Sequence, residues 1–70
     1  MKFKDLMKYI QLNTQIEIYY DKCIFINEGT AEQIKRMYAW EWFFMNKEIE
    51  SITINEESKA LMITIKEDTK

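Results

Sequence analysis

Apolar residues near the start of the chain recur at helical spacing. Lysines and an aspartate occupy the intervening positions, while one stripe of the helix surface carries Phe3, Leu6, Met7 and Ile10. This pattern predicts a short helix over residues 2–11 that lies on a core.

Four later segments favour strands because isoleucine and aromatic residues alternate with polar ones or form short β-branched runs. They are residues 16–20 (IEIYY), 23–27 (CIFIN), 48–55 (EIESITIN) and 60–66 (ALMITIK). A tight turn at Asp21 and Lys22 separates the first two, and the polar loop 56–59 separates the last two. The spacing therefore predicts two β-hairpins.

A second helix is predicted between the hairpins. Thr30 and Gln33 have the spacing of a capping box, in which each side chain bonds the backbone of the other residue. Gly29, the only glycine, sits just before this cap, and no glycine or proline follows it. The helix is therefore expected to run from residue 31 to about residue 46, through the aromatic stretch MYAWEWFFM.

This order of elements predicts one α+β domain over residues 1–70. Two hairpins joined by a helix close most simply into a four-stranded antiparallel sheet. The short N-terminal helix and the longer central helix are expected to pack on one face of that sheet.

The helical count divides the aromatic stretch into two faces, and the face toward the sheet carries Tyr38, Trp42, Phe44 and Met45. With ~100° per residue and Ile34 at zero, Trp40 falls at about 240° and Phe43 at about 180°, on the side away from the sheet. Arg36 lies one turn before Trp40, and Lys47 lies one turn after Phe43. The predicted protein-binding site is therefore Arg36, Trp40, Phe43 and Lys47.

Glu41 favours a different arrangement. A continuous helix would place its carboxylate in the middle of the buried stripe, where it would need a partner. If the helix instead breaks near Ala39, residues 40–45 become extended. The inward side chains are then Trp40, Trp42 and Phe44, and the outward ones are Glu41, Phe43 and Met45. A third possibility is that the aromatics fold under the N-terminal helix or serve only self-association.

Composition and charge narrow the function classes. Apolar residues make up 47% of the chain and charged residues 31%, as in a globular domain. Acidic residues outnumber basic ones 12 to 10, which disfavours a phosphate-binding surface. A single-stranded nucleic-acid binder that stacks bases on exposed aromatics, such as Tyr19, Phe25, Trp40 and Phe43, is the main rival to a protein-binding module.

Residues for catalysis or metal binding are scarce. The chain has no histidine and one glycine, which removes the commonest general base and the glycine-rich phosphate loops. Cys23 is the only cysteine and is expected to be a buried thiol in a strand. We therefore expect no enzyme activity, no metal and no cofactor. The sequence also has no apolar run long enough to span a membrane, which predicts a cytoplasmic protein.

The segments KFKDLMKYI, NTQIEIYYDKCIFINEGTAEQI and IESITINEESKALMITI together resemble small proteins encoded by phages and prophages of Gram-positive bacteria. The resemblance covers most of the chain, in the order and style of its segments. It implies a protein that binds a host protein, and some proteins of this kind inhibit host defence systems, including as anti-CRISPR proteins. For the aromatic face of the predicted central helix, the expected mechanism is steric occlusion of the partner's surface. The partners expected are such a host protein, a second copy of the chain in a homodimer, or both.

Overall fold

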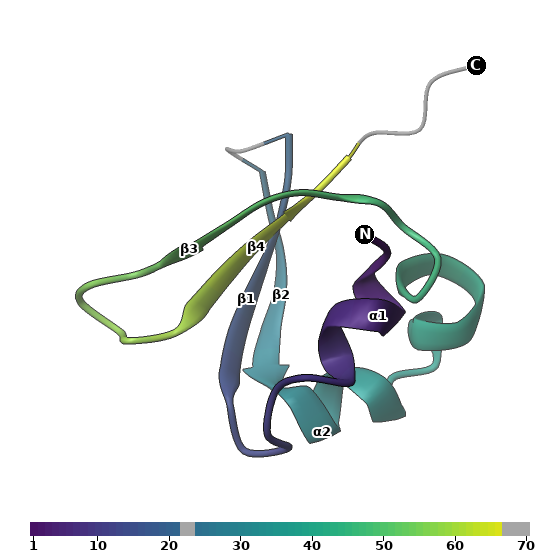
Figure 1. The fold of residues 1–70 in the computed structure, drawn as a ribbon, viewed down its shortest axis with the longest axis horizontal. Helices are drawn as coiled ribbons and strands as arrows, with labels where there is room; N and C mark the ends of the chain where they lie inside the picture. The colour runs from purple at the N-terminus through teal and green to yellow at the C-terminus, as the bar shows by residue number, and fades with distance from the viewer. Residues whose placement is uncertain (22–23, 67–70) are drawn as a thin grey trace.

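A computed structural model of the protein describes residues 1–21 and 24–66. In chain order its elements are α1 (Phe3–Met7), β1 (Gln15–Tyr20), β2 (Ile24–Thr30), α2 (Ala31–Arg36), the π-helical turn η1 (Trp40–Phe44), β3 (Ile49–Ile54) and β4 (Leu61–Ile65). The α+β class and the four-stranded sheet are confirmed (Figure 1). The prediction for Cys23 lies outside the described residues.

The sheet is mixed, so the prediction of a wholly antiparallel sheet is wrong. Both hairpins form as expected, with β1 antiparallel to β2 and β3 antiparallel to β4. The strand order is β2-β1-β4-β3, and the two central strands β1 and β4 run parallel. The reason lies in the connection that contains α2 and η1. It carries the chain from one edge of the sheet to the other and returns it to the end of the sheet where β2 begins. β3 therefore runs in the same direction as β2.

The core lies between the central strands and the helices. Ile16 and Ile18 on β1 and Ile63 and Ile65 on β4 are fully buried on the face that the helical segments cover. α1, α2 and η1 gather at one end of the molecule, and the β3–β4 hairpin extends away from them (Figure 1). Part of the apolar face of this hairpin is therefore left without a helical cover.

α1 is shorter than predicted, because the predicted helix 2–11 ends at Met7. The next two backbone N–H groups bond three residues back, Lys8 to Asp5 at 3.3 Å and Tyr9 to Leu6 at 2.9 Å, which tightens and closes the last turn.

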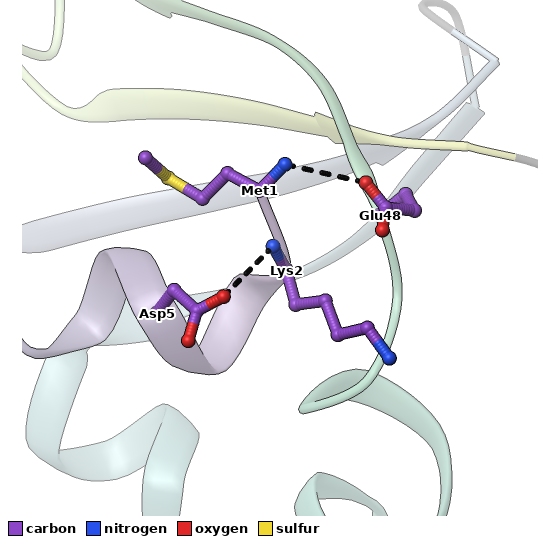
Figure 2. A network of polar contacts seen from close by, with 4 residues as sticks. All are labelled: Met1, Lys2, Asp5 and Glu48. Atoms are coloured by element: carbon purple, nitrogen blue, oxygen red, sulfur yellow. Dashed lines mark hydrogen bonds and ion pairs between the residues drawn. The ribbon is translucent and has the colours of Figure 1, made fainter.

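The start of α1 is anchored from outside the helix. The Phe3 N–H donates to the Lys47 carbonyl at 2.9 Å, and the Lys4 N–H donates to the Met45 carbonyl at 3.0 Å. The Lys2 N–H also lies 3.4 Å from the Asp5 carboxylate (Figure 2). These bonds satisfy backbone donors that a helix leaves free at its N-terminus. They also fix α1 against the chain that follows η1.

The predicted capping box at the start of α2 is confirmed. The Thr30 hydroxyl accepts from the Gln33 N–H at 3.2 Å, and the Gln33 side chain accepts from the Thr30 N–H at 2.9 Å. Gly29 precedes the cap with φ of +154°, a conformation that side chains other than glycine rarely adopt. The Gln33 side chain also occupies the space that a Cβ at Gly29 would need, because its oxygen would lie 2.9 Å from that atom.

Candidate aromatic interface

The central helix breaks at Met37, so the predicted continuous helix 31–46 is wrong. Met37 has extended backbone angles (φ −67°, ψ 146°), and its sulfur accepts a hydrogen bond from the Asn27 amide at 2.9 Å. The chain then re-enters a helical path at Ala39. One consequence is that Glu41 is exposed. A continuous helix would have buried this carboxylate, and an unpaired buried carboxylate is costly.

The second helical segment, η1, is a single π-helical turn. The Met45 N–H donates to the Trp40 carbonyl five residues back, at 2.8 Å. Because a π-helical turn is wider than an α-helical one, it changes which side chains share a face. Trp40 and Phe44 both point into the core, with exposed fractions of 8% and 3%. Trp42 points to solvent.

Three rings form what we call the aromatic surface: Tyr38, Trp42 and Phe43. Tyr38 is 88% exposed and Trp42 is 65% exposed, while Phe43 is half-buried beneath them. The Tyr38 and Trp42 ring centroids lie 6.0 Å apart, and those of Trp42 and Phe43 lie 5.9 Å apart, both edge to face. Tyr38 and Trp42 together expose roughly 300 Å² of side chain, comparable to the largest apolar patch on a typical monomer.

The aromatic surface rests on buried rings. Phe43 contacts Phe44 edge to face at 4.8 Å, and Phe44 contacts Phe3 of α1 at 6.4 Å. Phe3 is fully buried and also meets Trp40 at 5.2 Å. The possibility that aromatics fold under the N-terminal helix therefore holds for Trp40. An unbroken chain of ring contacts holds the exposed rings against the core.

The structure separates the predicted site residues Arg36, Trp40, Phe43 and Lys47. The expected solvent exposure of Trp40 is wrong, because the break at Met37 rotates this ring onto α1. Arg36 is exposed at the end of α2, and its guanidinium pairs with Glu32 at 3.2 Å. Phe43 and Lys47 do lie together, with the Lys47 ammonium 4.6 Å from the Phe43 ring centroid.

Lys47 is a positioning residue in this arrangement. It is only 8% exposed, so its side chain covers Phe43 rather than extending into solvent. A cation placed over a ring face in this way is stabilised by the ring quadrupole. Its backbone carbonyl also accepts the bond from Phe3 that anchors α1.

Sequence reasoning missed Tyr38 and Trp42, the two most exposed aromatics of the stretch. On one unbroken helix both side chains fall on the face toward the sheet, which is why the sequence predicts a core position for them. Glu41 carried the signal against an unbroken helix. A carboxylate predicted inside a buried stripe argues against that helical phase. The break at Met37 changes the phase and leaves Glu41 exposed.

A second aromatic pair lies on the sheet face that no helix covers. Tyr19 and Phe25 meet edge to face at 5.6 Å across β1 and β2. Partial burial, the charge of Glu17 and a 3.2 Å hydrogen bond to its carboxylate raise the pKa of Tyr19 above its ordinary value of 10.0, with Glu28 adding to the effect. This negative surrounding would repel a phosphate backbone. The pair is thus a poor platform for nucleic acid.

Comparison with protein-family models, curated proteins and solved structures finds no match to this chain. Within residues 1–21 and 24–66, no group of three or more acidic, histidine or cysteine side chains could hold a metal ion, and no pocket is found. No helix in the same residues has the length and apolar character needed to cross a membrane.

Proposed function

We propose that the protein is a non-enzymatic protein-binding module whose aromatic surface contacts a partner protein. The observation that carries this proposal is the exposure of Tyr38 and Trp42 beside each other, at 88% and 65%. Tryptophan and tyrosine are enriched among the residues that contribute most to binding energy at protein interfaces. Most of the area of these two rings faces water, so burial in the isolated fold accounts for only a small part of it.

Rigid support favours this use of the rings. The contacts through Phe43 and Phe44 to α1 hold the aromatic surface in place before any partner arrives. Binding then costs little side-chain entropy. π-helical turns are also frequent at functional sites. The exposed area of roughly 300 Å² is smaller than the ~800 Å² per partner of a standard interface, so the aromatic surface is the centre of a larger contact.

The partner to test first is a protein of the bacterial host. The resemblance to phage-encoded proteins favours such a partner, and steric occlusion of the partner's surface is the mechanism that needs no catalytic residue. In that setting the protein acts in the host cytoplasm. A second copy of the chain is the competing occupant of the same surface.

The test compares two variants in the same host lysate. Tyr38→Ser combined with Trp42→Ser removes both exposed rings, and Tyr9→Ser removes an equally exposed tyrosine (80%) outside the aromatic surface. Proteins that the wild-type chain and Tyr9→Ser capture, but the double variant does not, are identified by mass spectrometry. The purified candidate is then titrated against all three proteins.

The expected result is a direct complex that the double variant weakens by at least ~100-fold, since hot-spot residues cost 2 kcal/mol or more each when truncated. Circular dichroism of the double variant should show an intact fold. Equal binding by wild type and the double variant would refute the assignment of this surface. A doubled mass in light scattering that the double variant abolishes would identify a second copy as the occupant.

A further inference from the structure

β3 is an edge strand, and among the described residues its outer side is paired only at its start. There the Ile49 N–H donates to the Met1 carbonyl at 2.9 Å, and Lys2 forms an antiparallel bridge with Glu48. The Met1 ammonium also pairs with the Glu48 carboxylate at 3.3 Å (Figure 2). Past Ile49, no described segment of the chain pairs with this edge of the sheet.

The hydrogen-bond pattern of the hairpin shows which backbone groups point outward. The Asn55 N–H donates to the Ala60 carbonyl at 2.9 Å, so these residues form a bonded pair between β3 and β4. Bonded and non-bonded positions alternate in an antiparallel ladder, and Thr53 is therefore the next residue bonded to β4. Ile54 lies between these positions and Ile52 lies on the other side of Thr53, so both direct their N–H and C=O groups to the open edge.

The same two residues carry exposed apolar side chains. Ile52 is 40% exposed and Ile54 is 57% exposed. They lie opposite Ile63 and Leu61, on the face that the helices cover elsewhere. The hairpin extends beyond that cover (Figure 1). Open backbone groups and uncovered isoleucines thus coincide on one short stretch of strand.

Carboxylates flank this stretch on both sides. Between residues 48 and 58 the chain has four glutamates and no lysine or arginine: Glu48, Glu50, Glu56 and Glu57. The Met1 ammonium neutralises Glu48, but the other three form no ion pair with another described residue. The open edge is therefore apolar at its centre, with Glu50 at one end and a turn with a net charge of −1, from Glu56, Glu57 and Lys59, at the other.

This charge pattern disfavours a second copy as the occupant. A two-fold antiparallel pairing of β3 with itself that matches Ile52 with Ile54 brings Glu50 of each copy next to the turn that carries Glu56 of the other copy. Like charges brought together in this way repel each other. The two neighbouring two-fold registers set an isoleucine opposite Glu50 or Glu56. An added strand with lysine or arginine next to Glu50 and Glu56 avoids both the repulsion between carboxylates and the contact of isoleucine with a carboxylate.

We propose that the open edge of β3 binds an extended, cationic segment of a partner protein as an added strand. Backbone bonds to Ile52 and Ile54 supply the pairing, and apolar residues of the added strand lie beside these two side chains. Lysine or arginine residues of the added strand lie near Glu50 and near the turn at Glu56 and Glu57. This surface is separate from the aromatic surface, so the inference does not rest on the function proposed above.

The experiment uses the isotope-labelled full chain and a defined probe, the capped peptide acetyl-Lys-Val-Lys-Val-Lys-Val-Lys-amide. Amide hydrogen exchange is measured by NMR with and without peptide, at low salt. We expect the Ile52 and Ile54 amides to exchange at least ~10-fold more slowly with peptide, because an added strand makes them hydrogen-bonded. The same peptide with glutamate in place of lysine should protect neither amide.

Two variants separate the contribution of backbone hydrogen bonding from that of charge. Ile52→Pro removes an outward N–H without removing a bond to β4, so it should keep the fold and abolish peptide binding. Combining Glu56→Lys with Glu57→Lys leaves the backbone unchanged and should weaken the lysine peptide by ~10-fold or more, while allowing the glutamate peptide to bind.

Three results would overturn the proposal. The first is an absence of protection at both amides with saturating lysine peptide. The second is equal protection by the two peptides, which would remove the role of charge. The third is protection in the absence of peptide together with a doubled mass in light scattering, which would assign the edge to a second copy.

Discussion

The two tryptophans of the stretch WEWFF directly test which side chains of η1 face the core and which face solvent. Trp40 and Trp42 are two residues apart, yet their exposed fractions are 8% and 65%. Trp40 therefore buries more of its surface than Trp42, and the difference exceeds half of a tryptophan side chain. With ~200 Å² per side chain and ~25 cal/mol per Å², this difference corresponds to about 3 kcal/mol.

We expect Trp40→Ala to lower the free energy of unfolding by about 3 to 5 kcal/mol, since it also removes the ring contact with Phe3 at 5.2 Å. Trp42→Ala should lower it by about 1.5 kcal/mol or less. For a domain of this size the two melting temperatures should differ by roughly 12 to 24 °C. Chemical denaturation followed by circular dichroism measures both variants without relying on tryptophan fluorescence.

Fluorescence of the two single-tryptophan proteins provides an independent readout. Replacing Trp42 with phenylalanine leaves only Trp40, whose emission should be blue-shifted and resistant to iodide quenching. Replacing Trp40 with phenylalanine leaves Trp42, which should emit at longer wavelength and be quenched readily. Equal costs for the two alanine variants, or a larger cost for Trp42→Ala, would refute the break at Met37 and restore the continuous helix.

Three further predictions concern the α2 cap and Tyr19. Gly29→Ala should destabilise the fold by about 1 to 3 kcal/mol in thermal unfolding, because its φ is positive and its Cβ would meet Gln33. Thr30→Ala should cost about 1 kcal/mol in urea titration while Thr30→Ser retains most of the stability, because only the hydroxyl caps Gln33. The raised pKa of Tyr19 means that its contribution to stability is complete below pH 10 and declines as pH rises through the folded-state pKa; Glu17→Gln should lower that pKa in a tyrosinate absorbance titration.

The sequence predicted those features of the fold that depend on residues close together in the chain. The capping box at Thr30 and Gln33 formed as expected, because its bonds depend on residues three apart. Both hairpins formed for the same reason, since a short polar turn leaves two adjacent strands little choice. The parallel pairing of β1 with β4 depends on the path of a long connection, and no short pattern encodes that path.

The candidate site was harder to predict because it depends on helical phase. If the break at Met37 is overlooked, every later side chain is predicted on the wrong face. A register slip in a strand has the same effect. Trp40 was consequently expected on the surface and Trp42 in the core, the reverse of what the structure shows. The rings of this stretch that do remain exposed are those of Tyr38 and Trp42.

The aromatic surface and the open edge of β3 differ in the kind of contact they can make. One presents rigid rings on a π-helical turn, and the other presents backbone groups bordered by carboxylates. η1 and the tip of the β3–β4 hairpin lie toward opposite ends of the molecule, whose longest dimension is 35 Å (Figure 1). Distant sites without shared contacts usually contribute additively to free energies. Removing the rings of Tyr38 and Trp42 should therefore leave peptide protection at Ile52 unchanged, and each surface can be assigned or rejected by its own experiment.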